Sequence, residues 1–293
     1  MMNAPESDFN YRILRNHSFG LIDPSVTFDL PAGIVGKPIV PTALQASKHL
    51  MPMLLDLRAL TDENQNVLLA SFYDAHTSHH PPPIRLLIDT DETAEQLTRR
   101  WNRLQLASLA PGFTSWLRLH DPRVLHQLLR ILTPAQQLVL LGKASALQYW
   151  VGDNWNRFGA NDVDLEKGQS SGIGSYGVHL AWDWRRIEDI GIINRALEIA
   201  EAEAPNVSWQ RSELAEQLII KAREAYALTN TNDLVEFVTR GLLTNSDFDR
   251  HPKIAVLINP ADDPEDDSTL SDRLALIDES IWNELRPSTL ART

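Results

Sequence analysis

Hydrophobic residues in the first half of the chain recur with two different periods that alternate along the sequence. Short apolar runs typical of buried strands occur at Phe19–Asp23, Met51–Leu60, Ile84–Ile88 and Ala144–Val151. Between them, apolar residues recur at helical spacing after Thr61, which is a good N-cap, and again from Thr90 or Asp91 to about Leu106. Strands that alternate with helices predict an α/β lobe with a mixed, partly parallel sheet and flanking helices.

The stretch Phe113–Leu132 combines both periods. Alternating aromatic and apolar residues up to Leu119 predict a buried strand, and Val124–Leu132 carries one helical apolar stripe. Asp121 between them is suited to cap the helix, and the proline after it costs nothing at the first helical position. Arg123 opposes the helix dipole there. It either pairs with a nearby carboxylate for structural reasons or presents its guanidinium at the carboxyl end of the strand, where α/β folds place ligands.

The second half of the chain predicts helices throughout. Helical apolar stripes occur at 187–200, 208–228, 233–243 and 270–285, and no comparable strand pattern follows Trp184. We therefore expect an α/β lobe at 1–158, a glycine-rich linker at 159–183 and an all-α lobe at 184–293. The linker contains G-x-G-x-x-G at Gly172–Gly177, but no apolar strand precedes it, so the pattern favours a loop over a nucleotide site.

Charge is distributed unevenly along the chain. Residues 1–150 carry 13 acidic and 13 basic side chains and residues 151–293 carry 26 and 14, so the whole net charge of −12 lies in the second part. This excess argues against nucleic-acid binding there and indicates either a solvated face or a surface for a basic partner. The densest basic cluster is Arg99, Arg100 and Arg103, on one predicted helix face. It is either a solvated face or a contact for an acidic partner segment.

Few residue patterns point to catalysis or to a cofactor. The chain has no cysteine, which excludes disulfides and thiolate chemistry. His76, His79 and His80 in Asp74–Pro83 are conceivable metal ligands, but three following prolines favour an exposed loop. No nucleophile-elbow, P-loop or zinc-protease motif is present. No signal peptide or 18-residue apolar run is visible, so we expect a cytoplasmic protein without a membrane span, metal or cofactor.

The stretch from Trp116 through Asp121-Pro122-Arg123 to the helix that begins at Thr133 resembles the central signature of the type VI secretion adaptors. These proteins are also called effector chaperones (Tap or Tec) and carry a domain-of-unknown-function label. The strong agreement covers about residues 110–158, with weaker agreement from residue 18 onward.

The resemblance implies a non-catalytic adaptor that binds a toxic effector in the bacterial cytoplasm and loads it onto the VgrG spike. Trp116, Asp121 and Arg123 are then signature residues, and Arg99, Arg100 and Arg103 are candidates for partner binding. Two other classes stay open: an enzyme, such as a hydrolase with an unrecognised site, and a structural component of the secretion apparatus.

Overall fold

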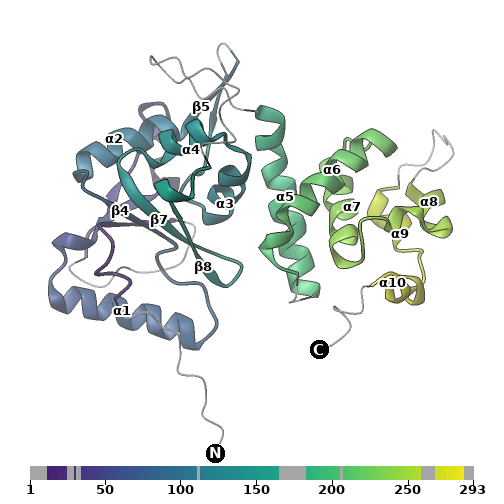
Figure 1. Cartoon of the computed structure of the whole chain (residues 1–293), viewed down its shortest axis with the longest axis horizontal. Coiled ribbons are helices and arrows are strands. Elements are labelled where there is room, and N and C mark those ends of the chain that lie inside the picture. The colour runs from purple at the N-terminus through teal and green to yellow at the C-terminus, as the bar shows by residue number, and fades with distance from the viewer. Residues whose placement is uncertain are drawn as a thin grey trace, which may run out of the picture. The chain divides into compact units, whose positions relative to one another are not determined.

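A computed structural model of the chain describes residues 12–24, 30, 34–110, 113–164, 183–204, 207–258 and 268–286. The chain divides into two compact units, Met1–Trp182 and Asp183–Thr293 (Figure 1). Most of the expected linker at 159–183, including all four glycines from Gly168 to Gly177, lies outside the described residues. The acidic stretch Asp262–Asp267 also lies outside them.

The first unit is built on a six-stranded sheet of order β2-β3-β1-β4-β7-β8. Its strands are β1 (Phe19–Ile22), β2 (Lys37–Pro38), β3 (Met53–Asp56), β4 (Leu86–Thr90), β7 (Ala144–Val151) and β8 (Asn154–Gly159). Every neighbouring pair is antiparallel, so the prediction of a partly parallel sheet is wrong. Thr90 lies opposite Ala144, which means that the chain re-enters the sheet at the end where it left. The alternation of strands and helices along the sequence does not determine whether neighbouring strands run parallel or antiparallel.

Helices cover both faces of this sheet. They are α1 (Asp62–Thr77), α2 (Ala94–Leu104), α3 (Pro122–Ile131) and α4 (Pro134–Leu141). Leu87 of β4 packs with Leu68 and Phe72 of α1 on one face. Its neighbours Leu86 and Ile88 are equally buried and point to the other face, where α3 and α4 contact β7. Figure 1 shows α1 and α2 on opposite sides of the strands.

The helix starts follow local capping chemistry. Thr61 accepts a hydrogen bond from the backbone of Asn64, as predicted. Thr93 and Thr133 form capping boxes with the glutamines three residues later. The buried faces are also mostly as expected, with Leu97 and Trp101 of α2 inside. Val67, which we expected in the core beside Leu68, is 43% exposed.

A separate two-stranded hairpin precedes the Asp-Pro-Arg turn. It pairs β5 (Leu106–Ala110) with β6 (Phe113–Trp116) in antiparallel register. The sequence predicts a helix that continues to about Leu106, but α2 ends at Leu104 and β5 begins at Leu106. Strand β6 is shorter than the predicted strand and does not belong to the main sheet. Strand β8 and the short β2 were not predicted, because neither has an apolar alternation.

The described part of the second unit is helical. Its helices are α5 (Trp184–Glu203), α6 (Ser212–Tyr226), α7 (Thr231–Leu243), α8 (Pro252–Ile258), α9 (Leu270–Leu274) and α10 (Glu279–Leu285). Helix α7 is central to the core, where Phe237 and Phe248 lie 5.0 Å apart between ring centroids. The expected single helix over 270–285 is instead two, because the chain turns after Leu274 and Asp278 caps a new helix. Within the described residues, no helix has both the length and the apolarity needed to cross a membrane.

Candidate functional site

The Asp-Pro-Arg turn is held by the side chain of Asp121. Its Oδ1 accepts hydrogen bonds from the backbone N–H and from Nε of Arg123, both at 3.0 Å. Its Oδ2 accepts from Nη2 of Arg123 at 2.8 Å. One carboxylate therefore caps α3 and at the same time clamps a guanidinium in a bidentate pair, the geometry that makes such contacts strong. This is the structural pairing that the sequence left open for Arg123, and 39% of the arginine side chain stays exposed.

A second ion pair joins the same turn to β1. Arg118 donates from Nη2 to Oδ2 of Asp23 at 3.2 Å, and the same nitrogen lies 3.7 Å from Oδ2 of Asp121. Asp23 follows the last residue of β1, 95 positions earlier in the chain than Arg118. The turn is therefore anchored to the sheet through an ion pair. The Arg118 side chain is 39% exposed.

His120 lies beneath these charges and is 2% exposed. Within the described part of the chain, neither of its ring nitrogens has a hydrogen-bond partner, and Nε2 lies 3.9 Å from Oδ2 of Asp23. The Trp116 ring stacks on it at 5.7 Å between centroids, and Nε1 of Trp116 donates to Oε1 of Gln105 at 3.1 Å. Trp116 therefore ties the hairpin to the turn.

The electrostatics of this group follow from burial and pairing. Burial lowers the pKa of His120 to about 4, against the opposing influence of Asp23. Burial alone would raise the pKa of Asp121, but hydrogen bonds from Arg123 and the nearby guanidinium charges hold it below its usual value. Arg85 faces the same charges, and burial together with Arg123 lowers its pKa. We call Asp23, Arg85, Arg118, His120, Asp121 and Arg123 the Asp-Pro-Arg cluster.

The geometry corrects one argument made from the sequence. The sequence allows Arg123 to present its guanidinium at the carboxyl end of a strand of the α/β fold, but the strand before it is β6, which belongs to the separate hairpin. The rule for parallel sheets therefore does not apply here. What the cluster offers chemically is two half-exposed guanidinium groups on a rigid turn, suited to recognising carboxylates.

The three arginines of α2 have different environments. Arg100 was predicted to share a basic surface face, but its side chain is only 12% exposed. It donates from Nη2 to Oε2 of Glu92 at 2.6 Å and from Nη1 to the carbonyl oxygen of Leu140 at 2.8 Å. Arg100 is thus a structural clamp between α2 and the end of α4. Arg99 and Arg103 are exposed, as predicted.

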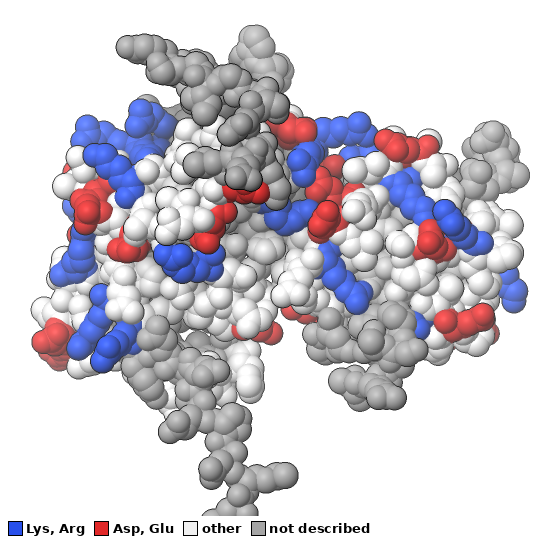
Figure 2. All heavy atoms as spheres, in the orientation of Figure 1, with Lys and Arg blue, Asp and Glu red and all other residues white. Residues whose placement is uncertain are grey.

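Arg99 and Arg103 line an open groove of about 680 Å³, which we call the α2 groove. Arg100, Glu92 and Lys143 contribute to its walls. Lys143 follows α4. The sequence does not predict that it belongs to this basic group, since only the fold brings it beside α2. Figure 2 shows lysine and arginine side chains gathered over α2 on the face in view.

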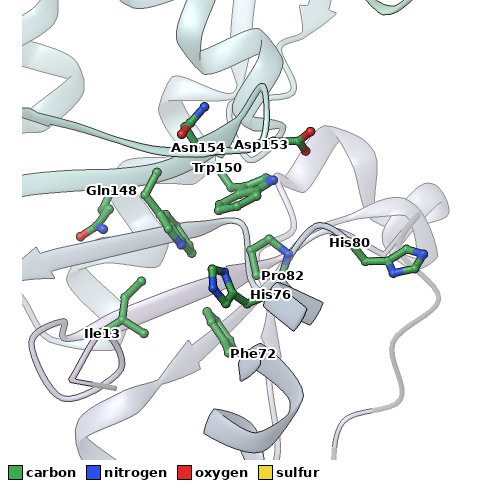
Figure 3. Close-up of a pocket in the computed structure, with 10 residues that line it drawn as sticks. Ile13, Phe72, His76, His80, Pro82, Gln148, Trp150, Asp153 and Asn154 are labelled. Carbon is green, nitrogen blue, oxygen red and sulfur yellow. The ribbon is translucent and has the colours of Figure 1, made fainter. Parts of the chain in front are cut away.

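An aromatic cavity of about 300 Å³ lies in another part of the first unit (Figure 3). Phe72 of α1 and Trp150 and Trp155 of the β7–β8 hairpin form its walls, with His76 and His80 at its edge. In Figure 3 the His76 ring lies between Phe72 and Trp150, whereas His80 points away.

The histidine-containing segment Asp74–Pro83 was predicted to be an exposed loop, but its first residues are helical, because α1 continues to Thr77. Within the described residues, no group of three or more His, Asp or Glu side chains is placed to hold a metal ion.

Sequence reasoning missed Asp23, Arg85, Arg118 and His120 as members of the cluster. A buried histidine beside a capping aspartate carries no local signal, and the partner of Arg118 lies in a distant strand. The one available hint was the concentration of charged and titratable residues between Arg118 and Arg123.

Comparison with known families gives a match on this region. A family model described as a domain of unknown function, DUF4123, matches residues 40–138. The matched range includes the α2 arginines and the whole Asp-Pro-Arg turn, and it ends within α4. No curated protein and no solved structure matches the chain.

Proposed function

We propose that this protein is an adaptor that binds a type VI secretion effector in the cytoplasm and delivers it to the VgrG spike. The observation that carries the proposal is the family match over residues 40–138, which falls on the stretch that resembles the effector adaptors. The matched domain is associated with adaptors of this system. The role requires a folded surface that recognises a protein segment, and no cofactor or turnover.

The arrangement of the first unit supports a binding role. Arg118 and Arg123 each keep 39% of the side chain exposed while a buried carboxylate holds the guanidinium in place. A cation fixed in this way loses little side-chain entropy when a partner carboxylate binds, so its contribution to affinity is larger than that of a mobile lysine. The two arginines would therefore contact the effector.

The test is co-expression of the tagged protein with an effector encoded beside its own gene and with the corresponding VgrG. We expect a complex that survives size-exclusion chromatography and a higher soluble yield of the effector. Arg118→Gln should weaken the complex, whereas Arg157→Gln, which changes a 61% exposed arginine of β8, should not.

The two alternatives give different results in the same preparation. A hydrolase would bind neither partner stably and would turn over a substrate in an activity screen. A structural component would co-sediment with assembled secretion tubes in place of a one-to-one effector complex. Either result would contradict the adaptor proposal.

A further inference from the structure

The exposed cations of the α2 groove form no close ion pairs in the described part of the chain. Arg99, Arg103 and Lys143 are exposed, and none of them forms an ion pair with a carboxylate anywhere in the described residues. Arg99 donates a hydrogen bond from Nε to the carbonyl oxygen of Glu95 at 3.4 Å. The groove therefore presents cations whose charge the fold neutralises only in part, through the attraction between Arg99 and Glu95.

The local charge balance is opposite in sign to that of the whole chain. Arg100, which pairs with Glu92, lines the same groove. The residues that line the groove carry four cations and one carboxylate, an excess of three positive charges. The chain as a whole carries −12. Such a local reversal attracts a negatively charged segment, and steers it to this face.

The spacing of the two exposed arginines indicates the form of that segment. Arg99 and Arg103 stand four residues apart on α2, so their side chains leave the helix from adjacent turns. Two like charges at this spacing destabilise a helix slightly, and Glu95, one turn before Arg99, offsets only part of that repulsion. A partner helix with carboxylates one turn apart presents two acceptors at the matching separation, and Lys143, which also lines the groove, can bind a third.

We propose that the α2 groove binds an acidic helical segment of a partner protein, through Arg99, Arg103 and Lys143. A nucleic acid is the less suitable occupant, because its continuous phosphate charge requires a much larger basic surface and would meet the net negative charge of the chain. The inference rests on the proposed function only in naming the effector as the natural source of the segment.

The experiment measures binding of a fluorescein-labelled helical peptide by anisotropy. The probe has about 20 residues, long enough to be helical in water, with glutamate pairs four residues apart along one face. We expect saturable binding that weakens as salt is raised, and a loss of about tenfold or more in Arg99→Glu/Arg103→Glu. The milder Arg99→Gln/Arg103→Gln should lose less.

Three controls make the result decisive. Arg185→Glu/Arg195→Glu makes the same change of charge on exposed positions of α5 and should leave the affinity unchanged. A scrambled peptide of identical composition tests the helical spacing, and a labelled single-stranded oligonucleotide tests the nucleic-acid alternative. Circular dichroism of each variant confirms that it is folded.

Equal losses in the α2 and α5 variants would overturn the proposal, because they would show an effect of net charge alone. Equal binding of the scrambled peptide would overturn the helical form of the partner. Tighter binding of the oligonucleotide, lost on reversal of Arg99 and Arg103, would replace the protein partner by a nucleic acid. Because the probe is synthetic, the groove is tested even if no effector complex is found.

Discussion

At the scale of single residues, the most unusual side chain is His120. It is 2% exposed, its ring nitrogens have no hydrogen-bond partner in the described part of the chain, and the charges of Asp23, Arg118 and Asp121 act on it. This buried imidazole makes no hydrogen bond to those charges and stays neutral at pH 7, because the cost of burying a cation outweighs the attraction of the carboxylates. His120 is therefore a neutral spacer beneath the Asp-Pro-Arg turn.

The depressed pKa of His120 predicts that stability falls on mild acidification. The folded pKa is about 4 and the unfolded value about 6.5, so between these values the unfolded chain binds a proton that the folded chain does not. The stabilisation is complete above about pH 6.5 and is lost as the pH falls towards 4. Between about pH 7 and pH 5 wild type should lose about 2 kcal/mol more than His120→Gln in urea unfolding. Parallel pH profiles of the two proteins would contradict this assignment.

Asp121 and Arg123 predict an ordered series of stabilities. Asp121→Ala removes the cap of α3 and leaves two guanidinium groups without their shared carboxylate, at a cost of about 2–3 kcal/mol. Arg123→Ala should cost less, about 1–2 kcal/mol, because Arg118 still faces Asp121 and water screens the exposed side.

Asp121→Asn is the matched control for that series. An asparagine side chain still accepts from the backbone at the N-cap, so this variant loses only the charge and should lie between the two alanine variants in chemical denaturation. If Asp121→Asn were as stable as wild type, the ion pair with Arg123 would contribute nothing beyond the cap.

At the scale of elements, the end of α4 depends on a glycine that lies in close contact with α2. Gly142 terminates α4 with φ +59° and ψ −115°, a conformation that residues with a side chain rarely adopt. A Cβ added there would lie 2.7 Å from Cδ of Arg100. The glycine thus lets α4 end directly against the clamp formed by Arg100 and Glu92.

Gly142→Ala should therefore destabilise the protein by about 1–3 kcal/mol through backbone strain and displacement of Arg100. The matched control is Gly191→Ala in α5, where a Cβ would meet nothing within 4 Å. Because alanine is the better helix former, that variant should be more stable by about 0.5–1 kcal/mol. Thermal unfolding of both proteins checks the opposite signs, and two changes of the same sign would contradict the argument.

At the scale of the whole molecule, the two units have separate hydrophobic cores. The first packs α1 against the sheet around Phe72, and the second packs around Phe237 of α7. Each unit also satisfies its own buried charges, as with Asp189 of α5, which accepts from Arg223 of α6 at 2.6 Å. A unit with its own core and its own paired charges has what it needs to fold alone.

We expect residues 1–182 and 183–293 to fold when they are expressed separately. The circular dichroism spectra of the two fragments should sum to that of the full chain, and each fragment should unfold cooperatively. A fragment that is soluble only when the other is present would show that the units depend on each other. An effector pull-down with each fragment then assigns binding to one unit, which we expect to be the first.

Much of the local structure was predictable because its causes lie within a few residues. Thr61 and Asp121 can cap their helices whatever the tertiary fold, since the acceptor and the free N–H groups are neighbours in sequence. The helical character of the second unit follows in the same way from apolar residues spaced three and four apart. The break after Leu274 escaped prediction, since a continuous apolar stripe hides a change of direction.

The sequence by itself determined most of the long helices, the buried central strands, the cap at Asp121, the exposure of Arg99 and Arg103 and the resemblance of the Asp-Pro-Arg stretch. Tertiary structure alone decided the antiparallel direction of the strands, the burial of Arg100 against Glu92 and the meeting of Arg118 with Asp23. The physical reason is the sequence separation of the residues that interact. Caps and periodic stripes depend on residues a few positions apart, whereas strand direction and ion pairing depend on how distant segments are placed in the fold. Many different chain paths are compatible with the same pattern of apolar residues.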